Sequence, residues 1–146
     1  MIVDAEYKNI VVAVDGSEAS EKAFRKALDI VKRNDARMIL AHVVDSRTFA
    51  TAEAYDRTLA ERAEEYAKDL VDSYVENAKV SGITNLVRCI EYGSPKVKIA
   101  KDIAGNFGTD LIICGATGMG AVERFLIGSV SESITRYASC DVLVVR

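Results

Sequence analysis

Short apolar runs alternate with helical patterns along the whole chain. The runs are rich in Val, Ile and Leu, and they lie at 10–14, 38–44, 86–90, 111–114 and 142–145. Continuous apolar runs of this length are typical of strands that are buried on both faces of a sheet. The third run, which contains Arg88, alternates less cleanly than the others. The pattern predicts five strands.

Helical patterns separate the first three predicted strands. Ser17 is a suitable N-cap for the first helix, because its side-chain oxygen can accept a main-chain N–H of the first turn. A long helix over 55–78 follows the second strand, and Gly82 suits the left-handed position after its last turn. The inner face of the first helix is predicted at Ala23, Ala27, Ile30 and Val31, and that of the long helix at Tyr55, Leu59, Ala63, Tyr66, Leu70, Tyr74 and Ala78.

Two further helices are predicted in the second half of the chain. Ser94 and Pro95 fit the N-cap and the first helical position of one of them. The other spans about 130–138. The inner face of the helix after Pro95 is predicted at Val97, Ala100, Ile103 and Ala104.

Strands and helices in strict alternation predict an α/β fold. Strands joined by helices of this length run parallel, because a parallel pair needs a crossover connection. We therefore expect residues 1–146 to form one domain, with an open, Rossmann-like, five-stranded parallel sheet and helices on both faces. Ligands of such sheets bind at the carboxyl ends of the strands, where the strand order reverses. The loops at 15–17, 45–51 and 115–128 are the candidates.

Composition and charge narrow the function classes. The 146 residues are 49% hydrophobic and 28% charged, with a formal net charge of −3 and scattered basic residues. This argues against a nucleic-acid partner, which usually requires a basic face. No signal peptide and no membrane-spanning run is visible, so a cytoplasmic protein is expected. The three cysteines form no CxxC pair, which favours small hydrophobic residues in a reducing compartment. The single histidine, His42, is predicted to be a half-buried strand residue rather than a catalytic base or a zinc ligand.

The segment after the fourth strand carries the candidate chemistry. Glycines stand at 115, 118 and 120, and Gly128 and Ser129 then open a helix. Glycine lets main-chain N–H groups approach a phosphate closely, and a helix N-terminus adds unpaired donors and a partial positive charge. No acidic residue lies between 115 and 121, and Arg124 adds a positive charge nearby. By contrast, Asp15, Glu18 and Glu21 would repel a phosphate from the first loop, which leaves Asp15 for the uncharged end of a ligand or a divalent cation.

A second interpretation of the same residues needs no ligand. The glycines at 118 and 120 can simply turn the chain, and Ser129 with Glu132 can form a capping box. Two familiar phosphate motifs are excluded. No Gly-Lys-Ser/Thr is present, and the loop after the first strand has one glycine where a dinucleotide fingerprint needs three.

At these residues the chain resembles the universal stress proteins. Their ATP-binding members carry Gly-x-x-Gly, nine residues, and Gly-Ser/Thr, which matches 115–118 and 128–129 here. The segments 12–17, 41–43 and 141–145 resemble the family's opening strand and loop, the end of its second strand, and its closing strand. The likeness covers nearly the whole chain. One departure is Ala116-Thr117, where many members have Ser-His or Ser-Arg.

The resemblance implies a ligand and a set of contacts. The ligand is ATP, AMP or ADP, with Mg²⁺ or Mn²⁺ expected alongside it. Val43 would pair with adenine through its main chain, and Asp15 would contact the adenosine end or the metal. The family also implies a homodimer through the last strand, 141–145. Gly115 would lie under the ribose, and the phosphates would be held by Gly118, Gly128, Ser129 and Val130, with Ser131 near them.

Three other function classes were weighed against a regulatory or stress-linked ATP-binding protein. An enzyme of the adenine nucleotide α-hydrolase group would have a Ser-Gly-Gly-x-Asp-Ser-like loop after the first strand. The segment 15–18 does not match this motif, so we expect at most slow ATP hydrolysis. A dimeric scaffold that binds no nucleotide is disfavoured by the intact glycine spacing. A signalling receiver is rejected, because 91–93 carries no phosphoacceptor Asp.

Overall fold

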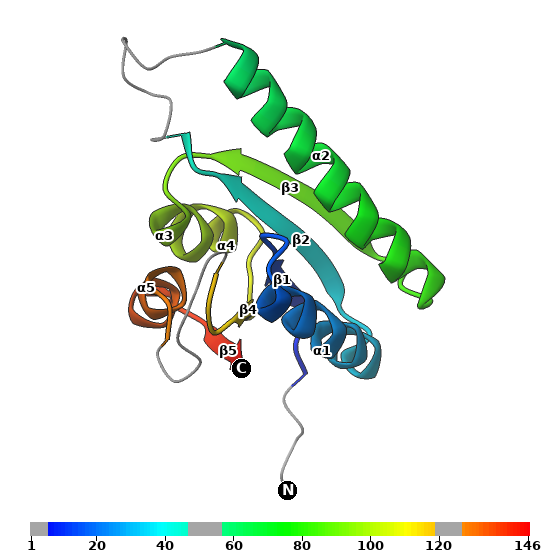
Figure 1. Ribbon diagram of the computed structural model, residues 1–146. Helices are drawn as coiled ribbons and strands as arrows, with labels where there is room; N and C mark the ends of the chain where they lie inside the picture. Colours follow the sequence, from blue (N-terminus) through cyan, green and yellow to red (C-terminus); the bar gives the residue numbers. More distant parts are fainter. Residues whose placement is uncertain (1–5, 47–56, 119–126) are drawn as a thin grey trace, which may run out of the picture.

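Five parallel strands form one sheet in the order β3-β2-β1-β4-β5 (Figure 1). The computed structural model describes residues 6–46, 57–118 and 127–146. All four strand pairings are parallel, so the predicted open parallel sheet is confirmed. The strands are β1 (Asn9–Ala13), β2 (Arg37–Val44), β3 (Leu86–Tyr92), β4 (Leu111–Gly115) and β5 (Asp141–Val145).

Helices pack on both faces of the sheet, as the sequence predicts. On one face lie α1 (Glu18–Asn34) and α2 (Arg57–Val80). The other is covered by α5 (Ser129–Tyr137) and by a helix made of α3 (Pro95–Val97), the π-helical segment η2 (Lys98–Ile103) and α4 (Ala104–Asn106). Alternate residues of β1 enter the two cores, Val12 on the α1 side and Val11 on the α5 side, and both are fully buried. Burial on both faces explains why the strands are continuously apolar.

The strand order reverses beside β1. The chain passes from β1 to β2 on one side, and β4 later pairs with the other side of β1. The loop after β1 and the loop after β4 therefore leave the same edge of the sheet next to each other. This is the position where open parallel sheets bind their ligands.

Local signals at the helix ends are largely confirmed. The Ser17 hydroxyl caps α1 by accepting the N–H of Ser20 at 3.1 Å. After α2, Gly82 has a φ of +97°, and its N–H donates to the carbonyl of Lys79. Pro95 is the first residue of α3 as predicted, although the Ser94 side chain makes no capping bond.

Two predicted helix faces are wrong in part. Val97 was expected to point inward, but it is 49% exposed, and Ile99 is buried in its place. The π-helical turn after Val97 has more residues per turn than an α-helix, and this rotates the inward-facing positions. On α2 the buried residues all lie within 67–78, and Leu59 and Tyr66 are about half exposed. Within the described ranges, no helix is long and apolar enough to cross a membrane.

Candidate functional site

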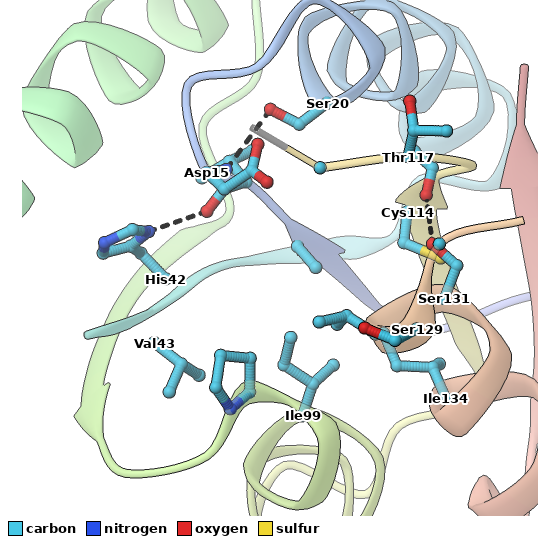
Figure 2. A pocket seen from close by; sticks show the side chains of 17 residues that line it. Asp15, Ser20, His42, Val43, Ile99, Cys114, Thr117, Ser129, Ser131 and Ile134 are labelled. Carbon is cyan, nitrogen blue, oxygen red and sulfur yellow. Dashed lines mark hydrogen bonds between the residues drawn. The ribbon is translucent and has the colours of Figure 1, made fainter. Parts of the chain in front are cut away.

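A pocket of about 360 Å³ opens at the carboxyl ends of β1, β2 and β4 (Figure 2). Its walls come from the loop after β1, the end of β2, the start of the α3–η2 helix, the end of β4 with the loop that follows it, and the start of α5. Segments far apart in the sequence therefore meet at one place. All of the predicted site residues line this pocket, namely Asp15, Val43, Gly115, Gly118, Gly128, Ser129, Val130 and Ser131.

The N-terminus of α5 forms one end of the pocket. Gly128 is the N-cap, with φ −64° and ψ 160°, and the first intrahelical bond runs from the N–H of Glu132 to the carbonyl of Gly128. The N–H groups of the first turn therefore have no acceptor within the helix. They belong to Ser129, Val130 and Ser131.

The capping box that the sequence suggests for Ser129 and Glu132 does not form at the start of α5. Ser129 is the first helical residue rather than the N-cap, and no side chain caps α5 among the described residues. Glu132 does not reach back to the cap; its carboxylate pairs with Arg136 one turn later at 2.7 Å. No capping box forms, because the cap position is occupied by a glycine, which has no side-chain oxygen.

Two glycines let the loop after β4 lie close to its neighbours. A Cβ on Gly118 would lie 3.3 Å from Oδ2 of Asp15, which also lines the pocket. A Cβ on Gly128 would lie 3.3 Å from the carbonyl oxygen of Ala116, to which the Gly128 N–H donates at 2.7 Å. The absence of side chains leaves open the space between the glycine loop and Asp15.

Gly115 is required for a different reason. A Cβ there would lie 2.7 Å from the carbonyl carbon and 2.9 Å from the carbonyl oxygen of Ala19 in α1. Separations this short between non-bonded heavy atoms are repulsive. Gly115 lines the pocket, but it is also the residue that lets α1 pack closely against β4.

Asp15 is held by the loop that it begins. Its Oδ1 accepts the N–H of Ser17 at 2.9 Å, and its own N–H donates to Oγ of Ser20 at 3.2 Å. Oδ2 faces the glycine loop at Gly118. One carboxylate oxygen is thus used to fix the side chain, and the other faces the pocket.

The main-chain N–H and C=O of Val43 lie beyond the end of β1. The register between β1 and β2 ends at Ala13 and Ala41. Val44 accepts the N–H of Gly93 on the β3 side, and the main-chain groups of successive strand residues point to opposite neighbours. The N–H and C=O of Val43 therefore face the β1 side, where β1 has already ended.

His42 lines the pocket beside Val43 and is more deeply placed than expected. Its side chain is buried, and Nδ1 lies 2.8 Å from the carbonyl oxygen of Val14. A carbonyl can only accept, so Nδ1 carries the proton in this contact. The ring ties β2 to the loop that carries Asp15, as Figure 2 shows.

Ser131 and Cys114 form the floor between β4 and α5. The Ser131 hydroxyl donates to the carbonyl of Gly115, and its side chain is buried. Burial raises the pKa of the Cys114 thiol from 9.0 to about 11, against a smaller lowering effect of its hydrogen bond with Ser131. Cys114 is therefore a neutral thiol at neutral pH. Within the described residues, Asp15 is the only Asp, Glu, Lys or Arg that lines the pocket.

Comparison with known proteins places this architecture in a family. The model of the universal stress protein family matches residues 6–146. The chain belongs to the universal stress protein family. A universal stress protein of Staphylococcus haemolyticus is 50% identical over 140 residues, which cover 96% of this chain and 85% of the relative.

Solved structures agree with this assignment. The universal stress protein UspA from Lactobacillus plantarum is 35% identical with a TM-score of 0.87, covering 98% of this chain and 100% of its own. The hypothetical protein MJ0577 is 30% identical with a TM-score of 0.85, covering 97% and 96% of the two chains. A universal stress protein crystallised in complex with cAMP is 25% identical with a TM-score of 0.70, covering 97% and 98%.

Sequence reasoning missed the apolar wall of the pocket in this universal stress protein. Pro95 and Ile99 from the α3–η2 helix and Ile134 from α5 line it, together with Ala13 at the end of β1. Ile99 and Ile134 are almost completely buried. No local signal distinguishes them from ordinary core residues, because only the packing of their helices on the sheet brings them to the pocket.

Proposed function

We propose that this universal stress protein binds ATP, or the related AMP or ADP, in the pocket at the carboxyl edge of its sheet. The observation that carries the proposal is the convergence of all the predicted contact residues on one pocket from four separate parts of the chain. A related structure at 25% identity was crystallised with cAMP, an adenine nucleotide, and this adds support. The proposed site belongs to a single universal stress protein domain over residues 1–146.

The phosphates would lie at the start of α5. Ser129, Val130 and Ser131 offer main-chain N–H groups with no acceptor in the helix, and the helix dipole adds partial positive charge. Gly118 and Gly128 keep side chains out of this space. Because the Ser131 hydroxyl already donates to Gly115, Ser131 would contribute through its main chain.

The adenosine would lie across the pocket from the first turn of α5. The N–H and C=O of Val43 can pair with the edge of a purine, and Ile99 and Ile134 provide an apolar surface for its faces. Gly115, at the end of β4, would lie under the ribose. Asp15 Oδ2 can accept a hydrogen bond from a sugar hydroxyl.

A divalent cation would arrive with the nucleotide. Among the described residues, no group of three or more His, Cys, Asp or Glu side chains is placed to hold a metal by itself. Mg²⁺ commonly binds through one or two carboxylates together with substrate phosphates. With a triphosphate bound, Asp15 Oδ2 would supply the carboxylate for Mg²⁺ or Mn²⁺ in place of its contact with the sugar.

Nucleotide release and thermal unfolding test the proposal. Freshly purified protein is denatured, and the released nucleotides are identified by chromatography. ATP with Mg²⁺ at a hundredfold excess over Kd should stabilise the fold by about 2.7 kcal/mol, which corresponds to a rise in Tm of about 5–10 °C at this chain length. CTP at the same concentration is the control for non-specific polyanion effects. An unchanged Tm with ATP, and no adenine nucleotide in the purified protein, would refute the proposal.

We also propose a regulatory role in a cytoplasmic homodimer. β5 is an edge strand, and its residues Val142, Leu143, Val144 and Val145 are only partly buried. An apolar edge of this kind is open to pairing with a second copy of the chain. Sedimentation should show a dimer that a Val144→Lys variant dissociates, and a monomeric wild-type protein at micromolar concentration would contradict the dimer.

Slow hydrolysis remains the second candidate function. No lysine or arginine among the described residues lines the pocket, so the described walls offer no cation to stabilise a transferring phosphoryl group. We expect phosphate release far below 1 s⁻¹, the lower end of the usual enzyme range. A turnover above that value would favour a dedicated enzyme over a binding protein.

A further inference from the structure

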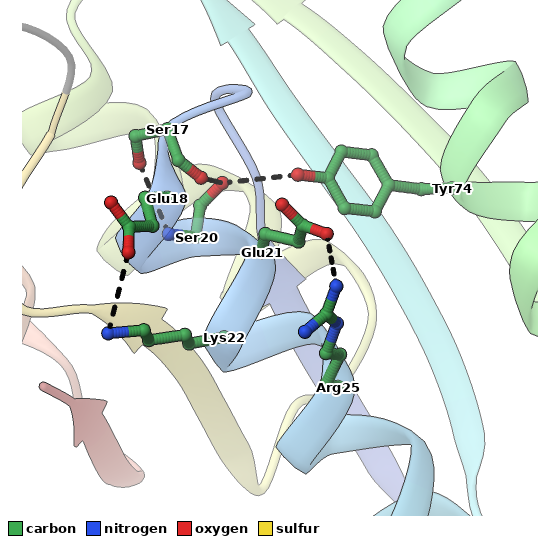
Figure 3. Close-up of polar contacts among 7 residues, drawn as sticks. All are labelled: Ser17, Glu18, Ser20, Glu21, Lys22, Arg25 and Tyr74. Carbon is green, nitrogen blue, oxygen red and sulfur yellow. Dashed lines mark hydrogen bonds and ion pairs between the residues drawn. The ribbon is translucent and has the colours of Figure 1, made fainter.

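Tyr74 lies on α2, outside the pocket, yet its hydroxyl reaches Ser20 in the first turn of α1 (Figure 3). The ring is buried and packs edge-to-face on Phe24, with ring centroids 4.7 Å apart. The phenolic oxygen lies 3.3 Å from Oγ of Ser20. Ser20 in turn lines the pocket and accepts the N–H of Asp15.

The hydrogen bonds around Ser20 have one consistent arrangement. The Asp15 N–H can only donate to Oγ of Ser20, and the carbonyl of Ser17, 3.3 Å from the same oxygen, can only accept. A serine hydroxyl has one proton and two lone pairs. The Ser20 hydroxyl donates its proton to the Ser17 carbonyl, and one of its lone pairs accepts the Asp15 N–H. The other lone pair can then accept a hydrogen bond from the Tyr74 O–H. All the observed contacts are kept only when Tyr74 donates.

The chemistry of Tyr74 suits this role. Burial raises the pKa of its hydroxyl above the usual 10.0. The hydroxyl therefore keeps its proton at neutral pH. A buried tyrosine hydroxyl needs a partner, and here the partner is the group that orients Asp15.

We infer that Tyr74 is a positioning residue for the nucleoside end of the proposed site. It acts through Ser20 on the main chain of Asp15, and this inference rests on the proposed nucleotide binding. Asp15 is held on three sides, by Ser20, by Ser17, and by His42 through the preceding carbonyl of Val14. Removing the Tyr74 hydroxyl frees the Ser20 side chain to rotate, which weakens the first of these constraints. The amide groups at the start of α5 are not part of this network.

The test compares ligands that use different halves of the pocket. Kd values for AMP, ATP and inorganic tripolyphosphate are measured by calorimetry on the full chain in the absence of divalent cations, so that Asp15 can act only on the nucleoside. The proteins are wild type, Tyr74→Phe, Ser20→Ala and the double variant. The phenylalanine keeps the ring on Phe24. Loss of one net hydrogen bond should weaken AMP and ATP by about two- to tenfold and leave tripolyphosphate unchanged. In the Ser20→Ala background, Tyr74→Phe should have no further effect on Kd.

A second tyrosine provides the matched control. The Tyr7 hydroxyl donates to Oδ2 of Asp141 at 2.7 Å. This contact lies at the amino ends of β1 and β5, whereas the pocket lies at the carboxyl ends of the strands. Tyr7→Phe also loses one hydrogen bond, so it should change none of the three Kd values, whatever it does to stability.

The outcomes separate this inference from the proposed function. Wild-type affinity for AMP in Tyr74→Phe, or an equal loss for AMP and tripolyphosphate, would overturn the positioning role while leaving nucleotide binding intact. Additive effects of Tyr74→Phe and Ser20→Ala would also overturn it, because the hydroxyl would then act by another route. A wild-type protein that binds neither AMP nor tripolyphosphate would overturn the proposed function and the inference together.

Discussion

Two glycines, one at the end of β4 and one in the loop after it, should respond differently to a single methyl group. Gly115→Ala would place its Cβ 2.7 Å from the carbonyl carbon of Ala19 and 2.9 Å from the Ala19 carbonyl oxygen and Cβ. Ordinary carbon contacts lie at about 3.5–4.0 Å, so the start of α1 would have to move away from β4. Gly118→Ala would meet only Oδ2 of Asp15, at 3.3 Å, which is the end of a side chain.

The expected magnitudes follow from these contacts. Overpacking against a rigid main chain costs about 1–3 kcal/mol, so Gly115→Ala should lower Tm by about 2–12 °C. Gly118→Ala should stay within about 0.5 kcal/mol of wild type, as surface substitutions usually do. Its methyl group enters the space proposed for the phosphates, so ATP affinity should fall by about tenfold or more, which is 1.4 kcal/mol. Gly118→Val should abolish binding.

Urea unfolding and calorimetric titration with ATP measure the two effects separately. Gly105→Ala is the matched control, because an added Cβ in α4 meets nothing within 4 Å and alanine favours a helix. It should be as stable as wild type or more so, with unchanged ATP affinity. Wild-type stability in Gly115→Ala would refute the packing argument. Unchanged ATP affinity in a folded Gly118→Ala protein would refute the placement of the phosphates.

Three further predictions concern stability. Asp35 ends α1 in the left-handed conformation with φ 50°, which costs a non-glycine residue about 1–2 kcal/mol. Asp35→Gly should therefore raise the free energy of unfolding, measured with urea, by about 0.5–1 kcal/mol. A decrease would contradict this. Ser17→Ala removes the N-cap of α1 and should cost about 0.5–2 kcal/mol in the same assay, whereas Ser139→Ala, in an exposed turn, should cost little. In the folded protein the pKa of Cys114 is raised from 9.0 to about 11, so the unfolded chain loses this proton at a lower pH than the folded one. The free energy of unfolding should therefore fall as pH rises from 9 to 11. Cys114→Ala should show a shallower fall than wild type.

The amino-acid sequence determined the elements and the glycine loop. Five apolar runs became five parallel strands, and in β1, β2 and β4 burial on both faces selects such runs. The spacing of Gly118 and Gly128 and the position of Asp15 pointed to the loops that meet in the pocket, and the family resemblance added Val43, Val130 and Ser131. These features depend on local chemistry, so they can be read along the chain.

Other features were decided only by the tertiary structure. Ile99 faces the pocket because a π-helical turn rotates its helix, and Gly115 is a glycine because α1 passes close to it. The capping box considered at Ser129 does not form, since the helix begins one residue earlier than that pattern assumes and Gly128 takes the N-cap position. Tyr74 reaches Ser20, and through it Asp15, only because α2 packs beside α1. Each of these depends on contacts between segments distant in the sequence, and local patterns carry no information about which distant main chain or side chain will lie nearby.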